Sequence, residues 1–401
     1  MSWVPVPAGS DFPVTNLPYG IFGRPGELHR VGVAIGDQVL DLAGLALRGA
    51  LARPDCFVAG SLNTFLAAGR PVWQSTRHRL IELLSSPAHR GAVEPWLIPM
   101  AEVMLHLPFE VADYVDFYSS LDHATNIGRI LRPNAEPLTP NWRHLPIAYH
   151  GRAGTVVVSG TPIVRPCGQR MAPGETSPAY GPSQRLDIEA EVGFVVGLPS
   201  ALGTRVPASD FAEHVFGVVL VNDWSARDVQ AWEYQPLGPF LGKSFATSVS
   251  PWVVPLDALS AARVDGPVQS PAPLPYLSTS GGSALDLSLE VSLNSCVISR
   301  PPFAGTYWTA DQQLAHLTVN GAALRTGDLY ASGTVSGPSR DQRGSLIELT
   351  WNGEQPLELP DGSTRTFLDD GDVVSIRATA PGPDGTRIGF GDVTGQVRPA
   401  R

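Results

Sequence analysis

Alternation of apolar and polar side chains is the feature that most limits the folds open to this chain. Residues 285–294 give the clearest case, because their odd-numbered positions are apolar and their even-numbered positions are polar. A strict period of two over this length is typical of a β-strand with one buried face. Similar short stretches, separated by connections rich in glycine and proline, continue to the C-terminus. The sequence therefore predicts a mainly β fold with some α-helix.

The N-terminal quarter combines a short β unit with helices. Residues 31–42 predict two strands joined by a Gly36–Asp37 turn, because glycine and aspartate suit the tight turn of a hairpin. Residues 62–69 and 71–86 have helical patterns, and Pro71 suits the first position of the second helix.

A domain boundary is expected after these helices. Residues 89–103 form a polar passage that contains prolines, which is typical of a link between domains. The length of 401 residues is also ample for more than one core. We therefore expect two domains, residues 1–110 and residues 111–401.

Charge and hydropathy restrict what this chain binds. Its net charge is −10 and it has no basic run, so we expect no nucleic-acid partner. No apolar run approaches the roughly 18 residues that a membrane span needs, so we expect no membrane partner. The first residues lack the basic and apolar parts of a signal peptide, which favours a cytoplasmic location.

The three cysteines argue against a cysteine metal site. Cys56, Cys167 and Cys296 are odd in number and form no CxxC pair, as expected in a reducing compartment. We interpret them as small buried hydrophobic residues.

Lysine is used once. Of the 28 Lys and Arg residues only Lys243 is a lysine, and the others are arginine. Arginine cannot reproduce the compact, titratable ammonium of lysine, so Lys243 is either a functional residue or a chance exception.

Residues 185–197 place three carboxylates on one face of an expected strand. Alternation puts Asp187, Glu189 and Glu191 on the same side. Three like charges repel each other, so this face is either solvated or neutralised by a divalent cation such as Ca²⁺ or Mg²⁺.

Another carboxylate follows a second apolar stretch. Asp223 comes directly after residues 216–222, where a strand end would direct it toward a cleft. Ser225 and Asp228 have the spacing of a capping box, which predicts a helix over residues 225–234. Three polar side chains have near-helical spacing on it: Arg227, Gln230 and Tyr234. The alternative is an ordinary capped helix with Asp223 in its entry turn.

Residues 113–128 contain a candidate base. Ser119 and Asp122 offer a capping box, which places His123 in the first turns of a helix. Asp116 and Tyr118 precede it. A single histidine can equally be a structural residue, and this alternative stays open.

Residues 345–351 alternate in the manner of a strand, with Glu348 as either a surface carboxylate or a buried partner.

Three well-known catalytic or nucleotide-binding motifs are excluded. Residues 238–244 lack the first glycine of a phosphate-binding loop because Leu237 occupies its place, and HExxH and GxSxG motifs are absent.

Several segments resemble the fumarylacetoacetase family, and they occur along this chain in the same order as in that family. The most specific is residues 221–248, VNDWSARDVQAWEYQPLGPFLGKSFATS. The other matching segments are DFPVTNLPYG at 11–20, RVGVAIGDQVLDL at 30–42, DFYSSLDHATNIG at 116–128, LPIAYHGRAG at 145–154, PLPYLSTS at 273–280, LYASGTVSG at 329–337 and TRTFLDDGDVV at 364–374.

The resemblance implies a fold and an activity. It implies an SH3-like barrel over residues 1–110, a mixed β-sandwich roll of the fumarylacetoacetase type over residues 111–401, and a homodimer. The implied reaction is metal-dependent hydrolysis of a carbon–carbon bond in 4-fumarylacetoacetate, a small diketo acid, to fumarate and acetoacetate in tyrosine and phenylalanine catabolism. The alternatives are a related enzyme that acts on acylpyruvates or oxaloacetate, and a non-catalytic metal-binding β module.

The resemblance also implies residue roles. The implied ligands of the catalytic Ca²⁺ or Mg²⁺ are Asp116, Glu189, Glu191 and Asp223. Asp223, Lys243 and Thr247 match a second, structural Mg²⁺ site. His123 matches the general base and Glu348 the carboxylate that orients it. Positions that stabilise an oxyanion are matched by Arg227, Gln230 and Lys243. Substrate-contact positions are matched by Tyr118, Arg132, Gln230, Tyr234 and Thr334. Asp187 matches no ligand and is expected to be a supporting charge.

Overall fold

The computed structural model describes residues 2–401. Its helices are α1 (Leu42–Leu47), α2 (Asn63–Ala67), α3 (Arg70–Ser85), α4 (Arg90–Val93), α5 (Leu121–Leu131), α6 (Phe211–His214), α7 (Arg227–Glu233), α8 (Ala310–Thr318) and α9 (Leu346–Leu349). Strands β1 to β5 are Tyr19–Gly23, Arg30–Ile35, Gln38–Asp41, Leu97–Pro99 and Met104–His106. Strands β6 to β15 are Tyr114–Phe117, Ala148–His150, Val156–Val158, Ile163–Val164, Cys167–Arg170, Ala179–Pro182, Leu186–Asp187, Ala190–Val196, Val215–Asp223 and Ser225–Ala226. Strands β16 to β27 are Thr247–Val249, Trp252–Pro255, Arg263–Val264, Ala284–Leu285, Ser288–Leu293, Cys296–Ser299, Leu329–Ala331, Leu357–Glu358, Thr364–Arg365, Val373–Pro381, Arg387–Gly389 and Val393–Arg398.

The fold is mainly β with some helix, as predicted. The hairpin of β2 and β3 turns at Gly36–Asp37, where Gly36 has a φ of 59°, a value that glycine adopts without strain. The helix predicted over residues 71–86 is α3, with proline in its first turn. No helix among residues 2–401 has the length and apolar character needed to cross a bilayer.

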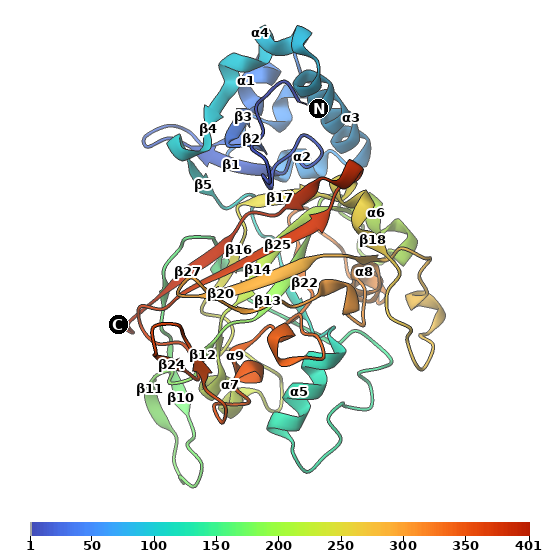
Figure 1. Cartoon of the computed structure of the whole chain (residues 1–401). Coiled ribbons are helices and arrows are strands. Elements are labelled where there is room, and N and C mark those ends of the chain that lie inside the picture. The colour runs from blue at the N-terminus through green and yellow to red at the C-terminus, as the bar shows by residue number, and fades with distance from the viewer. Residues whose placement is uncertain (1) are drawn as a thin grey trace.

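One large sheet connects the N-terminal part of the chain to the rest (Figure 1). It has 13 strands in the order β4-β3-β2-β1-β17-β14-β13-β22-β6-β7, with β5, β8 and β16 beside this path. The crossing point is the pairing of β1 with β17, at Tyr19 and Val253. These pairings close no barrel within residues 2–401, so the SH3-like barrel is not confirmed. The boundary at residue 110 falls between β5 and β6 and stays a prediction.

A second sheet packs on the first. It contains β21-β20-β25-β27-β9 and β26, and β25 lies against β14 of the large sheet (Figure 1). The alternation of residues 285–293 is confirmed, because Leu289, Val291 and Leu293 of β20 are buried in the core between the sheets. Two facing sheets with interdigitating apolar side chains make a β-sandwich.

Three local predictions are wrong. Residues 346–349 form the short helix α9 instead of a strand. Helix α7 begins after Ala226, so Ser225 is not its cap, and Asp228 bonds to Ser183 instead. Helix α5 is capped by Ser120, one residue after the expected Ser119, because the Ser120 hydroxyl accepts the His123 N–H.

The cysteines were expected to be buried. Of the three free cysteines, only Cys56 is fully buried.

Candidate metal centre and catalytic site

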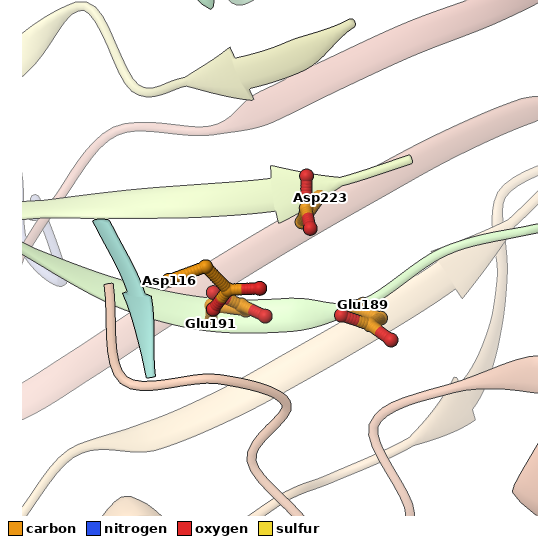
Figure 2. A group of neighbouring side chains, drawn as sticks. All are labelled: Asp116, Glu189, Glu191 and Asp223. Carbon is orange, nitrogen blue, oxygen red and sulfur yellow. The ribbon is translucent and has the colours of Figure 1, made fainter. Parts of the chain in front are cut away.

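Four carboxylates carried on or next to strands β6, β13 and β14 of the large sheet meet in its interior. Asp116 lies on β6, Glu191 on β13 and Asp223 at the end of β14, while Glu189 comes just before β13. One oxygen from each lies within 4.8 Å of the others, and Figure 2 shows all four side chains converging. The sequence alone left a solvated face open for Glu189 and Glu191, but both are buried, as are Asp116 and Asp223.

The cluster has the properties of a cation site. Both carboxylate oxygens of Glu191 and Oδ1 of Asp116 are buried without a hydrogen-bond partner among residues 2–401. Burial, together with the neighbouring carboxylates, raises the pKa of Asp116 and of Glu191 well above the usual range. Orphaned carboxylate oxygens are hard ligands, so the donor set fits a divalent cation such as Ca²⁺ or Mg²⁺.

Lys243 lies at one side of the cluster. Its Nζ donates to Glu189 Oε2 at 2.5 Å and to Asp223 Oδ2 at 2.6 Å. Burial opposes its charge, but these carboxylates outweigh burial and raise the pKa of Lys243. The Thr247 hydroxyl donates to the other oxygen of Asp223 at 2.9 Å. The one lysine of the chain is therefore a buried, charged partner of the cluster.

Arg227 and Gln230 of α7 lie next to the carboxylate cluster. Arg227 Nη1 contacts Glu189 Oε1 at 2.8 Å and donates to Gln230 Oε1 at 3.1 Å. Arg227 Nε donates to Asp187 Oδ2 at 2.8 Å, whereas Nη2 is buried without a partner in the described chain. Burial opposes the charge, but Asp187 and Glu189 raise the pKa of Arg227.

Asp187 does not share the face expected for it. Residues 188 and 189 interrupt the strand, and the Asp187 side chain turns away from the carboxylate cluster toward Arg227 and α9. Asp187 is fully buried.

His123 and Glu348 form a buried pair. His123 Nδ1 lies 2.6 Å from Glu348 Oε2, and Asn126 donates to Glu348 Oε1 at 2.9 Å. Ser336 and Ser345 also donate to Oε2 of Glu348. Burial raises the pKa of Glu348, but His123 and these hydrogen bonds outweigh it and hold the pKa below its usual value. The carboxylate therefore stays ionised beside the imidazole.

The residues expected to contact substrate have different surroundings in the structure. The Tyr118 ring packs edge-on against the His123 ring, with centroids 5.4 Å apart. Thr334 is buried and its hydroxyl has no partner within residues 2–401. Arg132 ends α5 and bonds to the Pro137 carbonyl. Tyr234 ends α7, and its hydroxyl accepts from Gln235 rather than from a cluster residue.

Sequence patterns missed several neighbours of the site. The Tyr149 hydroxyl donates to Asp223 Oδ2 at 3.2 Å, and the Tyr114 hydroxyl is buried near the same carboxylates without a partner in the described chain. Asn126 could have been found, because it lies three residues after His123 on one helix face. No local signal distinguishes the two tyrosines, since only sheet pairing brings them to the cluster.

Two family models match almost the whole chain. Residues 15–108 match the fumarylacetoacetase N-terminal model, and residues 114–398 match the fumarylacetoacetate hydrolase C-terminal model.

Curated proteins and solved structures agree with this result. The chain is 48% identical to fumarylacetoacetase of Homo sapiens, covering 100% of this chain and 99% of that protein. It is 47% identical to fumarylacetoacetase of Arabidopsis thaliana, covering 100% and 98%. Fumarylacetoacetate hydrolase of Exiguobacterium antarcticum has a similar structure, with a TM-score of 0.56, 17% identity, and coverage of 96% of this chain and 100% of that one. At that identity the structural likeness supports the fold alone.

Proposed function

Because this chain belongs to the fumarylacetoacetase family, we infer that it hydrolyses a carbon–carbon bond of 4-fumarylacetoacetate and releases fumarate and acetoacetate. The observation that carries the inference is the buried group of four carboxylates next to a His–Glu pair and two buried cations. A non-catalytic metal-binding module would leave the pair and the cations without a task.

The cluster carboxylates Asp116, Glu189, Glu191 and Asp223 are the proposed ligands of Ca²⁺ or Mg²⁺. A divalent cation held there would polarise the diketone oxygens of the substrate and stabilise the charge of the departing group. Asp223, Lys243 and Thr247 would border a second, structural Mg²⁺. Lys243 could ligate only through its carbonyl oxygen, since an ammonium has no acceptor.

His123 is the proposed general base. Because Nδ1 of His123 is held by Glu348, Nε2 is the ring atom left to take a proton from water. The hydroxide adds to the carbonyl carbon next to the scissile bond. When that bond breaks, the imidazolium returns its proton to the departing carbon of acetoacetate. Glu348 stabilises the imidazolium between these two transfers.

Lys243, Arg227 and Gln230 are the proposed donors to the tetrahedral oxyanion. Lys243 uses two of its three N–H groups on Glu189 and Asp223, so one remains. Nη2 of Arg227 has no hydrogen-bond partner among residues 2–401. Donors held in place before the reaction stabilise charge that develops in the transition state. Substrate contacts are assigned to Tyr118, Arg132, Gln230, Tyr234 and Thr334.

The wider assignments follow from the family. We place the reaction in tyrosine and phenylalanine catabolism, in the cytoplasm, with the chain as a homodimer. The family models also support the division into residues 1–110 and residues 111–401, since one ends at residue 108 and the other begins at residue 114.

A substrate comparison tests the proposed activity. Purified protein with Mg²⁺ or Ca²⁺ is incubated with 4-fumarylacetoacetate, an acylpyruvate or oxaloacetate, and loss of each substrate is followed by absorbance. We expect rapid loss of fumarylacetoacetate with equal amounts of fumarate and acetoacetate. A higher kcat/KM for an acylpyruvate or for oxaloacetate would assign the chain to the related activity instead.

A further inference from the structure

Asp187 is a buried carboxylate that the reaction described above does not use. It is 0% exposed and lies two residues before Glu189 of the carboxylate cluster. Its Oδ2 accepts from Arg227 Nε at 2.8 Å. This contact and that of Glu189 with Nη1 fix the plane of the guanidinium, so that Nη2 is the atom left without a partner in the described chain.

The same carboxylate also holds the start of α9. Oδ1 of Asp187 accepts the Leu346 N–H at 2.7 Å, and Oδ2 accepts the Ile347 N–H at 3.1 Å. Glu348 is the next residue and bonds to His123. Asp187 thus contacts both Arg227 and the backbone that leads directly into Glu348, the carboxylate beside the base.

We propose that Asp187 is a positioning residue that fixes the oxyanion donor Arg227 and the base-orienting Glu348 relative to each other. This inference rests on the proposed function. A carboxylate with four lone-pair directions can accept at once from a guanidinium and from the N–H groups of Ile188, Leu346 and Ile347. An asparagine amide in its place keeps one acceptor oxygen but points an NH₂ group at the remaining donors. It therefore cannot accept from both Arg227 and the N–H groups at the start of α9.

A buried aspartate elsewhere in the chain provides a matched control. Asp41 is 1% exposed, its Oδ1 accepts the Gly44 N–H at the start of α1, and its Oδ2 pairs with Arg30 at 2.8 Å. The change Asp41→Asn therefore removes the same kind of charge from the same kind of contacts, far from the cluster. We expect it to lower the melting temperature and to leave kcat unchanged.

Steady-state kinetics of Asp187→Asn test the proposal. We expect kcat to fall about 10- to 100-fold, the usual result of misplaced catalytic groups, with a much smaller change in KM. Affinity for Mg²⁺, measured by calorimetry, should stay within about threefold, because Asp187 contacts none of the cluster oxygens. Loss of Mg²⁺ binding would overturn the proposal, and so would wild-type kcat in a folded variant.

Double variants separate positioning from general destabilisation. In Arg227→Gln and in Glu348→Gln backgrounds, Asp187→Asn should cost less in kcat than in the wild type, since one partner is already lost. If the losses multiply unchanged, Asp187 does not act through these residues.

Two further outcomes are informative. Asp187→Glu keeps the charge with one extra methylene, so we expect a kcat between those of the wild type and Asp187→Asn. If neither Asp187 variant folds where Asp41→Asn does, Asp187 is a folding residue and the proposal is overturned. An inactive wild-type protein would contradict the proposed function. An active wild type with an equally active Asp187→Asn variant would contradict only the positioning role.

Discussion

At the scale of single residues, Lys243 shows how burial selects a side chain. The Lys243 side chain is 5% exposed, and its ammonium lies between Glu189 and Asp223. The guanidinium of an arginine is longer and planar, so it would place its donors differently from this compact ammonium. The sequence identified this residue by its rarity. It could not show its partners, because they come from distant strands.

We predict that Lys243→Arg lowers kcat by at least about 100-fold although the charge is kept, because donors and carboxylates would be displaced by an ångström or more. Steady-state assays with fumarylacetoacetate measure this loss. Arg30→Lys is the control, since it makes an equivalent cation exchange beside Asp41 and should keep kcat near that of the wild type. A near-normal kcat for Lys243→Arg would show that the single lysine is incidental.

The His123–Glu348 pair gives a second prediction at this scale. His123→Ala should lower kcat by about 10²- to 10⁴-fold, the usual contribution of a general base. Glu348→Gln keeps the shape but removes the charge beside the imidazolium, so it should also lower kcat.

Because the two residues act as one unit, the double variant should be little worse than His123→Ala alone. Bound metal, measured by elemental analysis, should be unchanged in all three variants. Losses that multiply, or activity in acid that is unaffected by His123→Ala, would place the base elsewhere.

At the scale of elements, three strands hold carboxylates that are hard to ionise together. Burial raises the pKa of Asp116, Glu191 and Asp223, which are the members on β6, β13 and β14. A carboxyl group whose pKa is raised in the folded state contributes stability at a pH below its ordinary pKa. That contribution is lost as the pH rises through the pKa of the folded state. The metal-free protein should therefore lose stability above about pH 5, where ordinary carboxyl groups are ionised.

A divalent cation should reverse this loss, so we predict that Mg²⁺ or Ca²⁺ raises the melting temperature more at pH 8 than at pH 5.5. Thermal unfolding in EDTA and in excess cation measures both increments. Glu191→Gln should reduce the dependence on pH, because it removes one of these ionisations. Equal increments at the two pH values would contradict the cation site.

Helix α9 shows what the local pattern could and could not predict. A period of two across residues 345–351 put Leu346, Glu348 and Thr350 on one face and favoured a strand, yet Ser345 and Glu348 also have the S-x-x-E spacing of a capping box. The Ser345 hydroxyl does contact Glu348, at 2.7 Å. That contact joins the two side chains, and the Ser345 side chain makes no cap hydrogen bond to the helix backbone. In a segment of four residues the period cannot separate a strand from a helix.

At the scale of the whole molecule, the sequence predicted the mainly β class, the N-terminal hairpin and the buried strand over residues 285–293. It did not predict that one sheet runs from β4 to β7, because the pairing of Tyr19 with Val253 depends on contacts between distant segments. Other long-range pairings place β22 between β6, which carries Asp116, and β13, which carries Glu191. Residue patterns indicated the acidic positions separately, and only the family resemblance joined them into one site.

Reconstitution of metal-free protein tests the central claim most directly. The chain is treated with EDTA, dialysed, and titrated with Mg²⁺ or Ca²⁺ while the diketone absorbance of fumarylacetoacetate is followed. We predict that turnover is lost with EDTA and returns with added cation in the wild type, and that Asp223→Ala and Glu191→Ala stay inactive throughout. Full activity of the wild type in metal-free buffer would contradict the account.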